Sequence, residues 1–152
     1  MKLAEALVLR ADLQKRIAQL KQRILNNALV QEGDEPSEAP STLLEEIELL
    51  LKQSEELAGR INHTNCETRL NSGDTLTAAL AHRDTLRFQS QLYRDLAEAA
   101  SNKRSRYSNS EIKYVSTVMV PQVQGQADDL AKKHRLLDTE IQQLNWNTDL
   151  KD

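Results

Sequence analysis

The sequence predicts an all-α protein of four long antiparallel helices. Only 39% of its residues are hydrophobic and 3% are aromatic, so a core has to be built mainly from Leu, Ile and Ala. Glycine (4) and proline (3) are scarce, which leaves few turns and therefore long elements. Apolar residues recur at alternating spacings of three and four, the pattern of a helical bundle or helical hairpins with coiled-coil-like seams. With 152 residues, the chain fits a single helical domain, 1–152.

The first helix is expected at about residues 2–28. Charged and Gln residues separate the members of its apolar seam, and Leu7 and Leu9 widen the stripe. The seam consists of Leu3, Ala6, Arg10, Leu13, Ile17, Leu20, Ile24 and Asn27. The segment 31–41 has Gly33, two prolines and no basic residue, so it is predicted to be a loop.

The second helix is expected at about residues 43–65. Thr42 and Glu45 fit a capping box at its start, with Ser41 as the alternative cap. Apolar members of its stripe stop after Ile61, where the sequence continues INHTNCETRLNSG, 61–73. This stretch is predicted to be the end of the helix and the following turn.

Two further helices are expected at about 75–100 and 121–144. Asp74 or Thr75 caps the third helix, and Pro121 suits the first turn of the fourth. Between them, the β-branched run IKYVSTVMV favours a short extended segment near 112–118.

Up-and-down packing of these helices places the N-terminus, residues 62–73 and the C-terminal tail at one polar end. Such an end is a candidate for small-ligand binding or catalysis. The alternative is that its Asn and Thr residues only terminate helices, while the single tryptophan covers the core. The candidate ligand-binding residues are Asn62, His63, Asn65, Cys66, Arg69, Asn145, Trp146 and Asn147.

No metal, cofactor or catalytic residue is predicted. His63 and Cys66 are three residues apart and share a helix face, but structural zinc sites use four ligands and catalytic ones three plus water. The chain lacks the Glu-x-x-His motif of di-metal bundles, a Gly-rich phosphate loop and the familiar hydrolase motifs. An enzyme of a familiar type is therefore not expected.

Three basic residues occupy seam positions among aliphatic residues, namely Arg10, Arg83 and His134. They are interpreted as a structural polar layer, with Asp84, Glu5 and Asp12 as candidate partners. The alternative is a buried anion or ligand site. A separate basic cluster lies in the loop after the third helix, and its phosphate-binding candidates are Lys103, Arg104 and Arg106.

The charge balance and the cysteine count indicate which class of partner and which cellular compartment the sequence favours. A net charge of −3 argues against a dedicated nucleic-acid binder. A single cysteine cannot form an internal disulfide and fits a reducing compartment. Neither a signal peptide nor a spanning helix is recognised, so we expect a cytoplasmic protein without membrane contact.

Three segments together resemble a family of small bacterial proteins labelled septicolysin-like. They are MKLAEALVLRADLQKRIAQLKQRILNNALVQEGDEP, TLTAALAHRDTLRFQSQLYRDLAEAAS, and RYSNSEIKY with LDTEIQQLNWNTDL. The resemblance covers nearly the whole chain and implies a cytolytic activity, but no site residue can be carried over from it. Because pore formation needs amphipathic strands or apolar spans, which the sequence does not show, cytolysin is the least favoured function.

Long helices in a small chain leave apolar surface to cover, so self-association is expected. The predicted function is a non-enzymatic structural or interaction protein that acts as a helical homo-oligomer, with an unidentified protein as a further partner. The alternatives are a ligand-binding or catalytic bundle using the polar end, and nucleic-acid binding through the basic loop.

Overall fold

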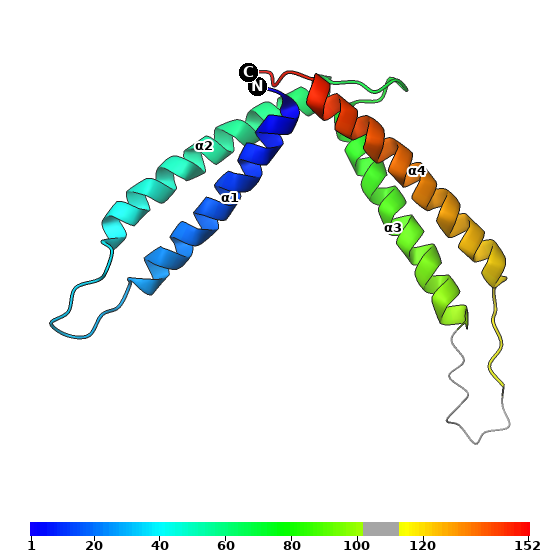
Figure 1. Cartoon of the computed structure of the whole chain (residues 1–152), viewed down its shortest axis with the longest axis horizontal. Helices are drawn as coiled ribbons and strands as arrows, with labels where there is room; N and C mark the ends of the chain where they lie inside the picture. Colours follow the sequence, from blue (N-terminus) through cyan, green and yellow to red (C-terminus); the bar gives the residue numbers. More distant parts are fainter. Residues whose placement is uncertain (102–112) are drawn as a thin grey trace. The chain divides into compact units, whose positions relative to one another are not determined.

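The computed structural model describes residues 1–101 and 113–152 and contains four α-helices in this part of the chain (Figure 1). They are α1 (Leu3–Asn26), α2 (Pro40–Glu67), α3 (Leu76–Ser101) and α4 (Val120–Asn147). The described residues form no strand, only two isolated bridges, Lys2 with Asp149 and Arg69 with Thr75. The prediction of an all-α protein with four long helices is therefore confirmed.

Local chemistry explains where the helices begin and end. Pro40 opens α2 at the first helical position, where its missing N–H costs nothing, so the predicted cap at Thr42 is wrong. The predicted Thr75 cap of α3 is confirmed, since its Oγ1 accepts the Ala78 N–H at 3.2 Å. Helix α4 continues to Asn147, three residues beyond the expected end. Residues 113–119 form neither helix nor strand, and Ile112 lies outside the described residues.

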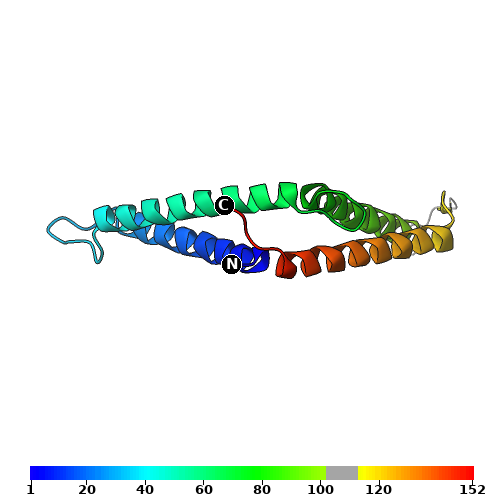
Figure 2. The same ribbon diagram turned by 90° about the horizontal axis from the view of Figure 1, so that it is seen from above.

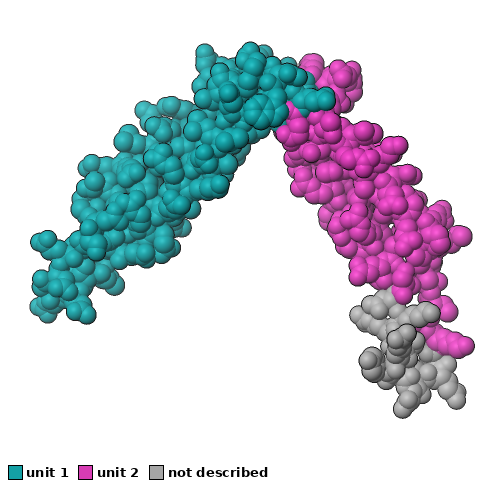
Figure 3. Space-filling view, viewed as in Figure 1, with its two compact units in different colours: residues 1–68, 143–152 teal, residues 69–142 magenta. Residues whose placement is uncertain are grey.

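The described residues divide into two compact units, coloured separately in Figure 3. Unit 1 consists of Met1–Thr68 and Gln143–Asp152, and unit 2 of the described residues within Arg69–Gln142. The expectation of a single domain stays a prediction.

In unit 1, α1 and α2 pack side by side and run in opposite directions, as Figure 2 also shows. Apart from Leu3 at the start of α1, their buried leucines recur every seven residues, as the heptad pattern predicts. These are Leu13 and Leu20 on α1, and Leu43, Leu50 and Leu57 on α2. The predicted loop between the helices is confirmed, and Arg23 pairs with Glu38 across its ends.

In unit 2, α3 and α4 also form an antiparallel pair (Figure 1). Small and apolar side chains fill the seam between them. Its buried members are Leu76, Ala79, Leu86, Ser90 and Ala97 on α3, and Val123, Ala127 and Ile141 on α4. The ion pair of Arg83 Nη1 with Asp138 Oδ1, 3.0 Å apart, sets the register near one end of the seam.

The C-terminal tail contacts the C-terminal half of α2 within unit 1, and the N-terminus pairs with this tail. We call residues 1–3 and 148–152 the terminal clasp. Its first and last segments are joined by hydrogen bonds from Leu3 N–H to Thr148 O and from Leu150 N–H to Met1 O, both 2.9 Å long. The clasp is anchored to α2 by Lys151 N–H, which donates to the fully buried Thr64 Oγ1 at 3.0 Å.

We predict that Thr64→Val lowers the free energy of unfolding by roughly 1 kcal/mol, because the part-buried hydrogen bond that Lys151 N–H donates to Thr64 is lost. Valine keeps the shape of the side chain, so packing changes little. Urea denaturation followed by circular dichroism measures the loss.

The matched control is Thr139→Val. Thr139 is exposed, and its hydroxyl only donates to Arg135 O within α4, as Thr64 does to Arg60 O. This variant is expected to change the free energy by less than about 0.5 kcal/mol. Equal losses for the two variants would contradict the anchoring role of Thr64.

Candidate functional site

The predicted polar end is partly assembled in unit 1. Asn62, His63, Asn65 and Cys66 lie in the last turns of α2, while Asn145, Trp146 and Asn147 end α4. All seven belong to unit 1, where the terminal clasp also contacts α2. Arg69 belongs to unit 2 and donates to Gly73 O at 2.8 Å.

Within this end the polar side chains have different surroundings. Asn145 is buried, whereas Asn62 and Asn147 are exposed. His63 Nε2 lies 3.5 Å from Glu67 Oε1 on the same helix. Trp146 is 59% exposed, so the interpretation that it covers the core is wrong. Ligand binding by these residues stays a prediction.

The three predicted seam residues also differ. Arg10 lies on α1 in unit 1, and Arg83 and His134 lie on α3 and α4 in unit 2. Arg83 contacts Asp138 and, at 3.5 Å, Asp84, which was one of its expected partners. The Nε atom of Arg83 and the Nε2 atom of His134 are buried and have no hydrogen-bond partner within the described part of the chain.

The basic loop residues Lys103, Arg104 and Arg106 lie outside the described residues, so phosphate binding there stays a prediction. Within 1–101 and 113–152, no three His, Cys, Asp or Glu side chains are grouped so that they could hold a metal ion. In the same ranges, no helix is long and apolar enough to cross a membrane.

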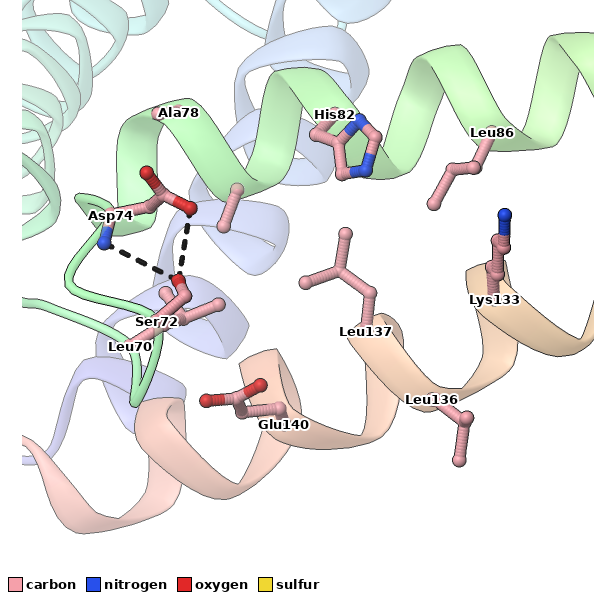
Figure 4. A pocket seen from close by; sticks show the side chains of 11 residues that line it. Leu70, Ser72, Asp74, Ala78, His82, Leu86, Lys133, Leu136, Leu137 and Glu140 are labelled. Carbon is pink, nitrogen blue, oxygen red and sulfur yellow. Dashed lines mark hydrogen bonds between the residues drawn. The ribbon is translucent and has the colours of Figure 1, made fainter. Parts of the chain in front are cut away.

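A pocket of about 540 Å³ lies in unit 2 between α3, α4 and the turn that precedes α3. Figure 4 shows Leu86 and His82 of α3 facing Leu137 and Lys133 of α4, with Glu140 and Asp74 toward the turn. Leu and Ala side chains therefore provide most of the wall, while His82, Lys133 and two carboxylates stand apart along it. Such a pocket suits a small molecule that is apolar in its middle and polar at its ends.

The turn that closes this pocket is built by local hydrogen bonds. Gly73 takes a φ of 91°, a conformation that glycine adopts without strain, and its N–H donates to Leu70 O at 2.9 Å. Ser72 Oγ donates to Asp74 Oδ2 at 2.9 Å (Figure 4). The turn is tied to α4 because Asn71 N–H donates to Glu140 Oε1 at 2.9 Å. The expectation that INHTNCETRLNSG is a helix end followed by a turn is confirmed.

Sequence reasoning missed this pocket. Its ionisable residues are far apart in the chain, and none belongs to a recognisable motif. Only the register between α3 and α4 brings His82 opposite Lys133, and that register depends on the seam rather than on local spacing.

A model for a family of unknown function (DUF6847) matches residues 10–150. The chain belongs to this family. A crystal structure of a functionally unknown conserved protein from Corynebacterium diphtheriae is similar to this member of DUF6847, with a TM-score of 0.94 and 46% identity over 99% of both chains. No curated protein matches the chain.

The resemblance to septicolysin-like proteins is wrong, because the family match and the solved structure do not point to that family. The three segments on which it rested include much of α1, α3 and the end of α4. The described helical parts of these segments are Leu- and Ala-rich and amphipathic, a composition that many helical hairpins share, and the segments carry no chemical motif. The cytolytic activity that the label implied is withdrawn with it.

Two carboxylates make the terminal clasp sensitive to acid. The hydrogen bond and the charge of Lys151, with a smaller effect of His63, lower the pKa of Glu67. The hydrogen bond and the charge of Lys2 lower the pKa of Asp149 in the same way. Because the folded-state pKa lies below the unfolded one, these pairs stabilise the clasp at neutral pH and lose this effect as acid protonates the carboxyl groups.

We predict that the clasp loosens as the pH falls below about 4.5, the ordinary pKa of the Glu67 carboxyl group. Hydrogen exchange of the Leu150 and Lys151 amides, corrected for the intrinsic effect of pH, measures this opening. In the double variant Glu67→Gln, Asp149→Asn, protection is expected to be weaker at neutral pH and nearly independent of pH. An acid response of the same size in the double variant would show that other groups hold the clasp.

Proposed function

We propose that this protein is a non-enzymatic interaction protein that acts as a helical homo-oligomer. One observation carries the proposal: the side chains of Phe88, Leu92 and Leu96 on α3 are 70%, 51% and 41% exposed. They are spaced four residues apart and form one continuous row, which we call the outer row. Contiguous apolar side chains of this kind mark interaction surfaces more often than scattered ones do.

Helix geometry separates the outer row from the seam. At about 100° per residue, these three side chains lie on the side of α3 away from the buried Ala79 and Leu86, which pack toward α4. Packing within unit 2 therefore leaves the row uncovered, and the only phenylalanine of the chain stands in it.

The outer row is suited to pairing with itself. If two α3 helices pack antiparallel about Leu92, Phe88 of each copy faces Leu96 of the other, and Leu92 faces its own counterpart. The next layer places Thr85 opposite Ala99, so no like charges meet along the row. A second copy of the chain is thus a chemically matched occupant, and a coiled-coil contact between copies is its expected form.

We predict that Phe88→Glu weakens self-association at least roughly 100-fold. Two Phe88 rings would be buried in a symmetric pair, and burial of each contributes about 1.5–3 kcal/mol. Sedimentation equilibrium over a range of protein concentrations measures the dissociation constant.

The control is Gln126→Glu, which adds the same charge at an exposed position of α4 and is expected to leave association unchanged. A wild-type chain that stays monomeric at high micromolar concentration, or an unaltered Phe88→Glu oligomer, would refute the proposed use of the outer row.

Binding of a small molecule is the second candidate function, and the unit 2 pocket is the observation that favours it. An apolar wall with His82 and Lys133 beside it fits an apolar molecule that carries an acidic group. This candidate moves the ligand-binding alternative from the polar end to unit 2. Nucleic-acid binding and a cytoplasmic location stay predictions from the sequence.

The dye 8-anilinonaphthalene-1-sulfonate, an apolar anion, is a suitable probe. We predict that Ala78→Phe, which fills the pocket, removes one dye-binding site in a fluorescence titration. Ala81→Phe adds the same side chain one turn along α3, at an exposed residue outside the pocket lining, and is expected to retain that site. Identical titrations for the two variants would argue against ligand binding there.

A further inference from the structure

A small cleft with a positive lining lies between α3 and α4 in unit 2, apart from the apolar pocket. Its volume is about 200 Å³. No carboxylate lines it, although the chain as a whole is acidic. The lining residues are Arg87, Ser90, Gln91, Arg94, Ala131 and His134.

Arg94 supplies a positive charge that the neighbouring acids do not neutralise. It has no hydrogen bond or ion pair with any of the residues the structure describes. Asp95, which follows it in the chain, instead accepts a hydrogen bond of 2.7 Å from Gln91 Nε2.

Arg87 is only weakly held. Its Nη2 atom lies 3.6 Å from Asp84 Oδ1, and both side chains are more than 60% exposed, so the pair contributes little in water. Asp84 also contacts Arg83 at 3.5 Å, which divides its charge between two guanidinium groups. Arg87 and Arg94 are seven residues apart, or about 10.5 Å along the helix, so their long side chains can converge on one ion between them.

Two groups deeper in the cleft have unused hydrogen-bonding capacity. The buried Nε2 atom of His134 has no partner in the described part of the chain. The hydroxyl of the buried Ser90 donates to Ala127 O at 3.5 Å, the outer limit of a hydrogen bond. Leaving such groups unsatisfied costs free energy, and an anion that enters the cleft can recover part of this cost.

We propose that this cleft binds a phosphate group, either as inorganic phosphate or as the phosphoryl end of a small molecule. Guanidinium groups match the paired oxygens of phosphate, and the imidazole and hydroxyl groups supply further hydrogen bonds from the wall. The cleft is larger than inorganic phosphate, which leaves room for the first atoms of an ester. This site shares no residue with the outer row or with the clasp.

Isothermal titration calorimetry with inorganic phosphate at low ionic strength tests the site. Saturable binding is expected, and Arg94→Gln is expected to weaken it about 10-fold or more because a charge-assisted hydrogen bond is lost. The control Arg135→Gln removes one positive charge from an exposed position on α4 and is expected to change the dissociation constant less than about twofold.

Two further measurements keep the test decisive. Gln91→Glu places a carboxylate at the cleft and is expected to weaken phosphate binding at least as much as Arg94→Gln does. Phosphate is also expected to shift the ¹⁵N resonance of His134 Nε2, which a diffuse attraction to surface charge would not do. Tighter binding of glycerol phosphate than of inorganic phosphate would assign the site to esters, and the reverse order to the free ion.

The proposal is overturned by the absence of saturable phosphate binding. Equal weakening in Arg94→Gln and Arg135→Gln would overturn it as well, because it would reduce the effect to net charge.

Discussion

A pair of antiparallel helices buries only one stripe on each helix, and most features of this protein follow from that limit. In both units the buried residues lie along a single seam, as with Leu50 and Leu57 on α2 or Leu86 and Ala97 on α3. Every other face stays in contact with water, including faces that carry large apolar side chains such as Phe88. Each hairpin therefore has a narrow core and a large surface in contact with water.

The terminal clasp adds burial where the α1–α2 seam alone would end. Leu3, Ile61 and Thr64 are almost completely buried there, which a simple two-helix pair would not achieve. A polar contact fixes where the tail lies on α2, because the Lys151 N–H uses the Thr64 hydroxyl as its acceptor. Burying a hydroxyl among apolar residues is favourable only when its hydrogen bonds are complete, and those of Thr64 run to the clasp and to Arg60 O.

Helix content, the approximate helix positions and many of the seam residues were predictable from the sequence, because spacings of three and four depend only on local geometry. The end of α2 and its turn were predictable for the same reason, since Gly73 and its polar neighbours signal a break. The predicted start of α2 was wrong because Pro40 was assigned to the loop. The unit 2 pocket and the phosphate cleft could not be predicted, because both depend on which residues of α3 and α4 face each other.

Arg83 illustrates why a charged residue can occupy a seam position between only two helices. Its side chain is 19% exposed, so the guanidinium group keeps some contact with water while it pairs with Asp138 across the seam. The full cost of burying a charge is therefore avoided, and the pair can fix the register of α3 against α4. One turn away, Arg87 has no acid of its own, because Asp84 is shared with Arg83. The positive charge of Arg87 is therefore only partly neutralised, because the seam residue Arg83 also contacts Asp84. This charge is the reason why the proposed cleft is expected to prefer an anion.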